Sequence, residues 1–166
     1  MSGKKSSIRS LLLMMAALLP VLAHSYVEAQ GPRTSSIAVV VHPDTPVTDL
    51  SLDEVRKIFL GDRQYWSAKL PVVLLMRAPV ARERDVVLRV IYQMNEAQFK
   101  RYWIAKIFRA ESATPPKTYY SNDMANELTA TIPGAIAIMD AGELQRGVKV
   151  VRIDGHLPTD SDYPLK

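Results

Sequence analysis

Three arginines, Arg77, Arg82 and Arg84, stand where the sequence changes from a predicted strand to a predicted helix. Arg77 directly follows the apolar run Pro71–Met76, and Pro79 then allows a helix to begin. In open α/β sheets, ligands bind beyond the carboxyl ends of strands, where the free amides of a helix start favour an anion. Arginine can add a bidentate, charge-assisted contact to an oxyanion. The order of these residues therefore predicts an anion site at Arg77, with Arg82 and Arg84 adding to the positive field.

A second interpretation of the same arginines needs no ligand. In that case they form a solvated face of the helix, and Arg77 pairs with an acidic neighbour. The residue types are compatible with both interpretations, so both stay open at this stage.

Residues typical of catalysis do not form a convincing group. The serines lie outside any nucleophile-elbow context, and Ser51 and Ser121 are better explained as helix caps. There is no cysteine, and a histidine-rich metal site cannot be built from His42 and His156, which are far apart. No glycine-rich phosphate loop is present. We therefore expect no enzyme activity, no cofactor and no metal.

The N-terminus carries the features of a secretory signal. Lys4, Lys5 and Arg9 precede an apolar run at residues 11–23, which is shorter than the roughly 20 residues that span a bilayer. Cleavage after Ala29 is expected, and cleavage after Ser25 is the second choice; an uncleaved anchor helix is the alternative. Residues 1–29 are thus predicted to be a signal peptide, and the chain is predicted to work in a bacterial periplasm.

The remaining residues, 30–166, are enough for one soluble domain with a core. The full chain has a formal charge of +4, and the signal residues contribute +2 of it, so the mature domain is near +2. Because basic residues are not grouped with aromatic ones, nucleic-acid binding is not expected.

Strand and helix patterns alternate along this domain. Apolar runs at Ile37–Val41, Pro71–Met76 and Ala135–Met139 predict buried strands, and Lys149–Ile153 predicts a fourth. Helices are expected after Ser51, which forms a capping box with Glu54, then after Pro79, Asn95 and Ser121. This order predicts an α/β domain with a mostly parallel sheet and helices on both faces.

Several of these segments together resemble the phosphate substrate-binding proteins of ABC transporters. The matching segments are Ile37–Val47, Leu50–Gly61, Trp66, Val72–Arg77 and Ile132–Ala137. The resemblance implies a periplasmic-binding-protein-like fold. It also implies that Arg77 matches a phosphate-binding arginine, and that phosphate and an ABC transporter or another inner-membrane protein are the partners.

Two departures from that family bear on function. The family's Ser-Gly-Thr, which holds phosphate with hydroxyls and amides, is replaced by Ala81, Arg82 and Glu83, and a carboxylate there would repel an oxyanion. The family's proteins are two-lobed and about twice the mature length, so this chain is expected to form a single lobe. The leading expectation is a solute-binding-like protein with weak anion binding. The alternative is an interaction or sensory module that has lost the ligand and presents its surface to a membrane protein.

Overall fold

The computed structural model describes residues 36–112 and 114–166. The predicted signal peptide lies outside the described residues. No helix in the described ranges is long and apolar enough to cross a membrane.

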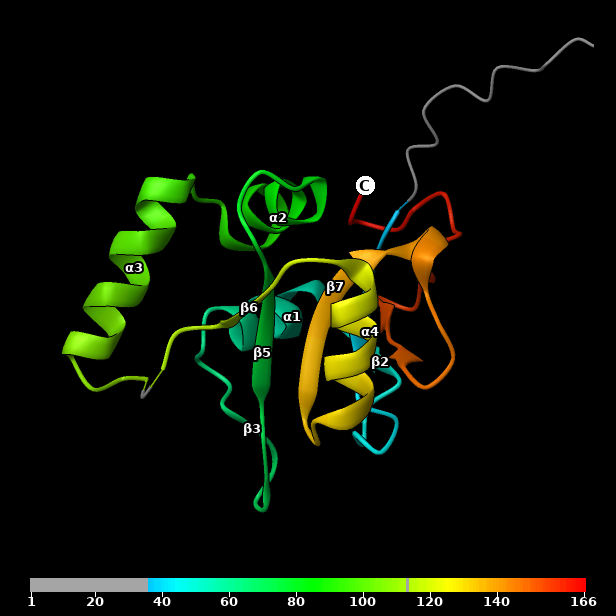
Figure 1. Cartoon of the computed structure of the whole chain (residues 1–166), viewed down its shortest axis with the longest axis horizontal. Coiled ribbons are helices and arrows are strands. Elements are labelled where there is room, and N and C mark those ends of the chain that lie inside the picture. Colours follow the sequence, from blue (N-terminus) through cyan, green and yellow to red (C-terminus); the bar gives the residue numbers. More distant parts are fainter. Residues whose placement is uncertain (1–35, 113) are drawn as a thin grey trace, which may run out of the picture. The chain divides into compact units, whose positions relative to one another are not determined.

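The described part is a mixed α/β domain (Figure 1). Its strands are β1 (Ile37–Val41), β2 (Asp49–Leu50), β3 (Tyr65–Ser67), β4 (Leu70–Pro71), β5 (Val73–Arg77), β6 (Lys117–Tyr119), β7 (Ala135–Asp140), β8 (Lys149–Val150) and β9 (Arg152–Ile153). Its helices are α1 (Leu52–Phe59), α2 (Arg82–Val86), the π-helical η1 (Val87–Tyr92), α3 (Glu96–Phe108), α4 (Asn122–Thr131) and the 3₁₀ turn η2 (Ala141–Glu143).

The central sheet has the order β6-β5-β7-β1-β8. β5 runs parallel to β6 and β7, whereas β1 pairs antiparallel with β7 and β8. Four of the five strands therefore share one direction, and the predicted mostly parallel sheet is confirmed. The predicted strand at Lys149–Ile153 is divided, because β9 leaves this sheet and pairs with β2.

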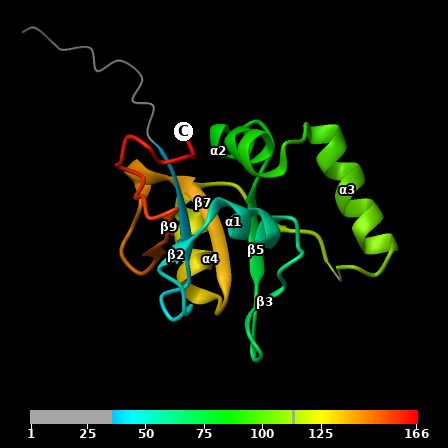
Figure 2. The same cartoon turned by 180° about the vertical axis from the view of Figure 1, so that it is seen from behind.

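Helices cover both faces of the sheet, as the alternating pattern predicts. The five residues of β1 are fully buried, with Ile37, Val39 and Val41 in the cluster that includes α1 and η1. Ala38 and Val40 point into the other cluster, which includes α4. Figures 1 and 2 show α4 on one side of the sheet and α1 on the other. A strand buried on both faces needs a continuous apolar run, and this explains the pattern read in the sequence.

Local sequence signals fix the helix starts. Ser51 and Glu54 form a reciprocal capping box at α1, and Asn95 and Gln98 do the same at α3. Ser121 caps α4 by accepting a hydrogen bond from the amide of Met124. Each of these contacts satisfies a helix-end amide from a residue three positions away, which is why the sequence alone predicts them.

Two of the motifs used in the resemblance meet in the structure. The indole Nε1 of Trp66 donates a 2.8 Å hydrogen bond to the carbonyl of Gly134. Gly134 has φ = 77°, and a Cβ there would lie 2.1 Å from the carbonyl oxygen of Pro71. Only glycine fits this close approach, and the Trp66 hydrogen bond joins the Pro133-Gly134 turn to β3.

Candidate functional site

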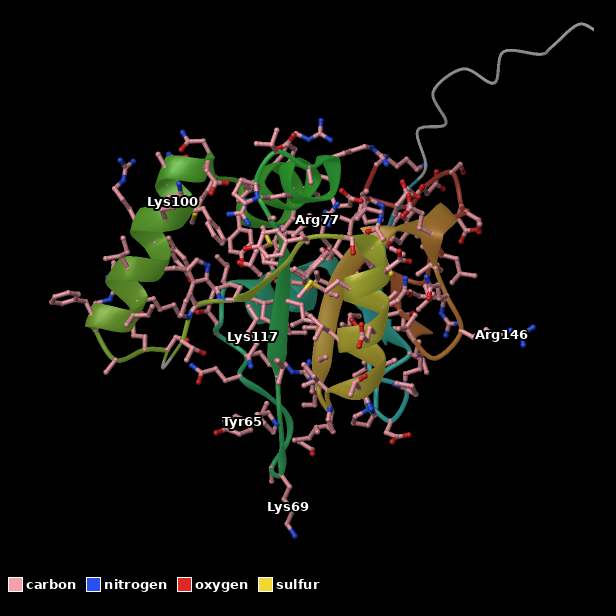
Figure 3. All side chains as sticks on the ribbon, in the orientation of Figure 1. Tyr65, Lys69, Arg77, Lys100, Lys117 and Arg146 are labelled. Carbon is pink, nitrogen blue, oxygen red and sulfur yellow. The ribbon has the colours of Figure 1, made fainter. Side chains whose placement is uncertain are left out.

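The carboxyl ends of three parallel strands meet at one edge of the sheet. β5 ends at Arg77, β6 ends at Tyr119 and β7 ends at Asp140. α2 begins five residues after Arg77, with Ala81 as its N-cap, and α4 begins at Asn122. This edge is where α/β sheets place ligands, and it is the candidate site (Figure 3).

Arg77 faces the carboxylate of Glu83 across the start of α2. Its Nε lies 3.8 Å from Glu83 Oε2, which makes an ion pair but is too long for a hydrogen bond. The guanidinium carbon is 5.7 Å from the centroid of the Tyr119 ring. Nε and Nη1 are buried and have no hydrogen-bond partner among the described residues. Arg77 thus has a counter-charge but retains two unused donors.

Glu83 is held in place by a polar network from α4 and the η2 turn. It is only 8% exposed, and Asn122 Nδ2 donates to it at 3.2 Å. The same Nδ2 donates at 2.8 Å to Glu143, and Asn126 donates to the backbone carbonyls of Asn122 and Glu143. The direct hydrogen bond to Glu83 comes from Asn122 of α4, and the contacts with Asn126 and Glu143 hold that asparagine in place beside it.

Arg84 packs inside the fold and does not face the candidate site. It is 6% exposed and forms a bidentate pair with Glu96, with both distances at 2.8 Å. It also donates to the carbonyl of Arg77 at 2.7 Å and lies over the Phe99 ring at 4.8 Å. The hydrogen bond from Arg84 holds the pKa of Glu96 below its usual value. Arg84 therefore joins α2 to α3.

Arg82 lies on the same edge as Arg77 and pairs with Asp140 at 3.3 Å. The charged groups at this edge include the cations Arg77 and Arg82 and the carboxylates Glu83, Asp140 and Glu143. The Glu83 carboxylate beside Arg77 would repel an added oxyanion, while the two arginines would attract it.

The three arginines predicted to form the anion site occupy different positions in the structure. The structure places Arg77 and Arg82 at the predicted edge, while Arg84 turns toward Glu96. The interpretation of the arginines as a solvated face is wrong for the buried Arg84, but Arg77 does pair with an acidic neighbour. Sequence reasoning missed Asn122 and Glu143. The signal that could have found Asn122 is its position directly after the Ser121 cap, at a helix start following a strand.

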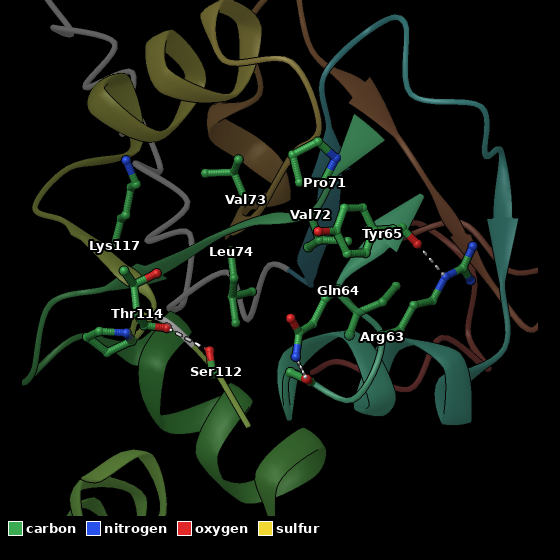
Figure 4. Close-up of a pocket in the computed structure, with 13 residues that line it drawn as sticks. Arg63, Gln64, Tyr65, Pro71, Val72, Val73, Leu74, Ser112, Thr114 and Lys117 are labelled. Atoms are coloured by element: carbon green, nitrogen blue, oxygen red, sulfur yellow. Dashed lines mark hydrogen bonds between the residues drawn. The ribbon is translucent and has the colours of Figure 1, made fainter. Parts of the chain in front are cut away.

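A separate cavity of about 210 Å³ lies alongside β5, and Figure 4 shows its lining. Its polar lining includes Arg63, Gln64, Ser112 and Lys117. Ser112 Oγ donates to the carbonyl of Thr114, and Gln64 Nε2 donates to the carbonyl of Gly61. These polar groups are thus partly used in local contacts. No group of His, Cys, Asp or Glu suited to a metal ion is found within the described ranges.

Comparison with solved structures gives the class of fold. The chain is similar to a putative phosphate ABC transporter substrate-binding protein with bound phosphate from Clostridium perfringens, at a TM-score of 0.60 and 20% identity. An ABC-type phosphate transport receptor from Vibrio cholerae matches with a TM-score of 0.60 and 17% identity, and PstS from Borrelia burgdorferi with 0.58 and 15%. Each match covers 75% of this chain, and 47%, 48% and 49% of the three neighbours, respectively.

These likenesses establish the periplasmic-binding-protein-like fold predicted from the sequence. This chain spans about half the length of the proteins it matches. No family model matches the sequence, and no curated protein matches it.

Proposed function

We propose that this chain is an exported periplasmic-binding-protein-like domain that works as an interaction module for a membrane protein, and that it is not an enzyme. The observation that carries the proposal is Glu83, which supplies the counter-charge of Arg77 from within the fold. The similar solved proteins are named as a putative phosphate ABC transporter substrate-binding protein and an ABC-type phosphate transport receptor, which supports a partner of the transporter type.

The charges at the Arg77 edge support an internal role for this arginine. A phosphate beside Arg77 would approach Glu83, and the Asn122 contacts hold Glu83 in place. Displacing Glu83 would also leave the amide of Asn122 with one acceptor fewer. Both effects lower the affinity for an oxyanion.

Weak oxyanion binding at Arg77 is the second candidate function. It is favoured by the two buried Arg77 nitrogens that have no hydrogen-bond partner in the described part of the chain. An oxyanion that displaced Glu83 would use these donors.

Calorimetric titration of residues 30–166 with phosphate separates the two functions. We expect no binding at millimolar concentration for the wild type, and measurable binding for Glu83→Thr, which removes the repelling carboxylate. Adding Arg77→Ala to Glu83→Thr should then weaken binding by about ten- to a hundredfold, since a charge-assisted contact is lost. Submillimolar phosphate binding by the wild type that Arg77→Ala abolishes would establish solute binding and overturn the module proposal.

Export is tested by N-terminal sequencing of the protein from the periplasm. The sequence should begin near Gln30, or near Tyr26 if the second cleavage position is used. An intact Met1 on a cytoplasmic product would contradict the periplasmic location.

A further inference from the structure

A groove of about 350 Å³ runs between α3 and the β5–β6 side of the sheet. Phe99, Ile104 and Ile107 of α3 line one side, and Met76 and Pro116 line the other. Figure 1 shows α3 beyond the β6 edge of the sheet. The volume is at the lower end of the range for binding pockets, so it can admit one or two large side chains.

The outer side of α3 continues the apolar surface of this groove. Ile104 is 60% exposed, and Ile107 and Phe108 follow it at i+3 and i+4 with 38% and 91% exposure. Residues at this spacing lie on one side of a helix. Single exposed apolar residues are ordinary, but a contiguous group beside a groove is typical of an interaction site.

The charged side chains that line the groove are both cations. Lys100 lines the groove and forms no close ion pair among the described residues, although its charge helps to lower the pKa of Glu96 one turn earlier on α3. Arg84, the other cation of the lining, is paired directly with Glu96. No carboxylate is among the lining residues in the ranges described. The exposed Arg101 follows Lys100 on α3. The groove therefore complements an acidic group next to an apolar one.

We propose that this groove binds a segment of a partner protein that carries acidic and large apolar side chains. A carboxylate of the segment pairs with Lys100, and its apolar side chains contact Ile104, Ile107 and Phe108. The proposal rests on the function proposed above, because it names the surface and the partner chemistry of that module. A hollow between two elements fits a protruding side chain better than it fits a flat bilayer surface.

The test is a selection of random displayed peptides on the purified mature chain, followed by fluorescence anisotropy with the enriched peptides. We expect enrichment of peptides that combine Asp or Glu with Phe or Leu. Lys100→Glu and Ile104→Ser should each weaken their binding by about tenfold or more. Arg146→Glu is the matched control, because Arg146 is exposed and forms no ion pair within the described residues. The peptides should bind this variant as tightly as they bind the wild type. Phe108→Ser provides a second apolar variant at a position that is 91% exposed and does not support the fold.

Three results would overturn the proposal. Enriched peptides that lack acidic residues, or that bind Lys100→Glu as well as wild type, would remove the charge argument. Sedimentation with anionic vesicles that depends on Lys100 and Ile104 would assign the surface to lipid. A dimer that forms with rising concentration and is lost in Ile104→Ser would assign it to a second copy of the chain.

Photo-crosslinking in cells distinguishes failure of this groove from failure of the module function. A crosslinking residue at Phe108 should capture the same periplasmic or membrane partner in repeated preparations, and capture should be lost with Lys100→Glu. A crosslinking residue at Tyr65, which is 58% exposed on β3, serves as the control position. Capture from Tyr65 alone would support the interaction-module function but contradict partner binding at the groove. No capture from either position, together with phosphate binding by the wild type, would reject the module itself.

Discussion

The Arg77 edge and the α3 groove differ in whether their charged groups are paired and whether their apolar side chains are exposed. At the Arg77 edge, Glu83 faces Arg77 and Asp140 pairs with Arg82. At the groove, Lys100 has no ion pair in the described part of the chain, and Ile104 and Phe108 are exposed. This difference underlies our proposals that the first region supports the fold and that the second binds a partner. Substitutions at the two regions should therefore affect different measurements.

The largest expected effect is on stability and comes from Arg84→Ala. This change removes the partner of Glu96, the hydrogen bond to the Arg77 carbonyl and the contact with Phe99. Arg84 is buried but the Glu96 side chain is 35% exposed, so the loss should lower the free energy of unfolding by about 2 kcal/mol. Urea unfolding measures the loss. Arg101→Ala on the exposed side of α3 is the control and should change stability by less than about 0.5 kcal/mol; equal losses for both variants would contradict the structural role of Arg84.

A smaller loss is expected for Glu83→Gln. The amide keeps an acceptor for Asn122 but leaves the partly buried Arg77 without its counter-charge. We expect a loss of about 1–2 kcal/mol by urea unfolding. Added phosphate should then raise the melting temperature of the variant but not of the wild type, because a ligand stabilises the folded state it binds. A phosphate effect of equal size in both proteins would show that Glu83 does not control access to Arg77.

The Glu96 carboxyl provides a pH test of the same region. The hydrogen bond from Arg84 lowers its pKa in the folded protein relative to the unfolded chain. The stability it contributes is therefore present above its ordinary pKa and is lost as the pH falls through the lower folded value. Urea unfolding from neutral to acidic pH should show a fall in stability that is shallower in Glu96→Gln. Identical pH profiles for the two proteins would show that Glu96 does not contribute to the pH dependence of stability.

The smallest effect on stability is expected at the groove. Ile104→Ser and Phe108→Ser change exposed side chains, so their free energies of unfolding should stay within about 0.5 kcal/mol of wild type. Peptide binding should nevertheless fall, as argued above. A large stability loss in Phe108→Ser would show that this side chain packs within the protein and is not available to a partner.

The sequence predicts the parts of this structure that depend on neighbouring residues. The capping boxes at Ser51 and Asn95 join residues three apart, and the buried strand Ile37–Val41 is visible as an apolar run. The short strand β6 follows two prolines and has only three residues, so it was not predicted. The antiparallel direction of β1 is set by its pairing with β7, about a hundred residues away.

The candidate site was predicted only in part for the same reason. The position of Arg77 follows from a strand end, which the sequence indicates. The contacts that decide its role come from Asn122, and those that fix Arg84 come from Glu96. Such distant side-chain partners follow from tertiary packing and cannot be read from the spacing of residues.

The central claim is that Glu83, rather than a bound oxyanion, is the counter-charge of Arg77. The most direct measurement is the nitrogen-15 NMR signal of the Arg77 Nε–H group during titration of the wild-type mature domain with phosphate. We predict no saturable shift of this signal up to millimolar phosphate, and a saturable shift in Glu83→Thr. A saturable shift in the wild type at submillimolar phosphate would contradict the account and assign Arg77 to solute binding.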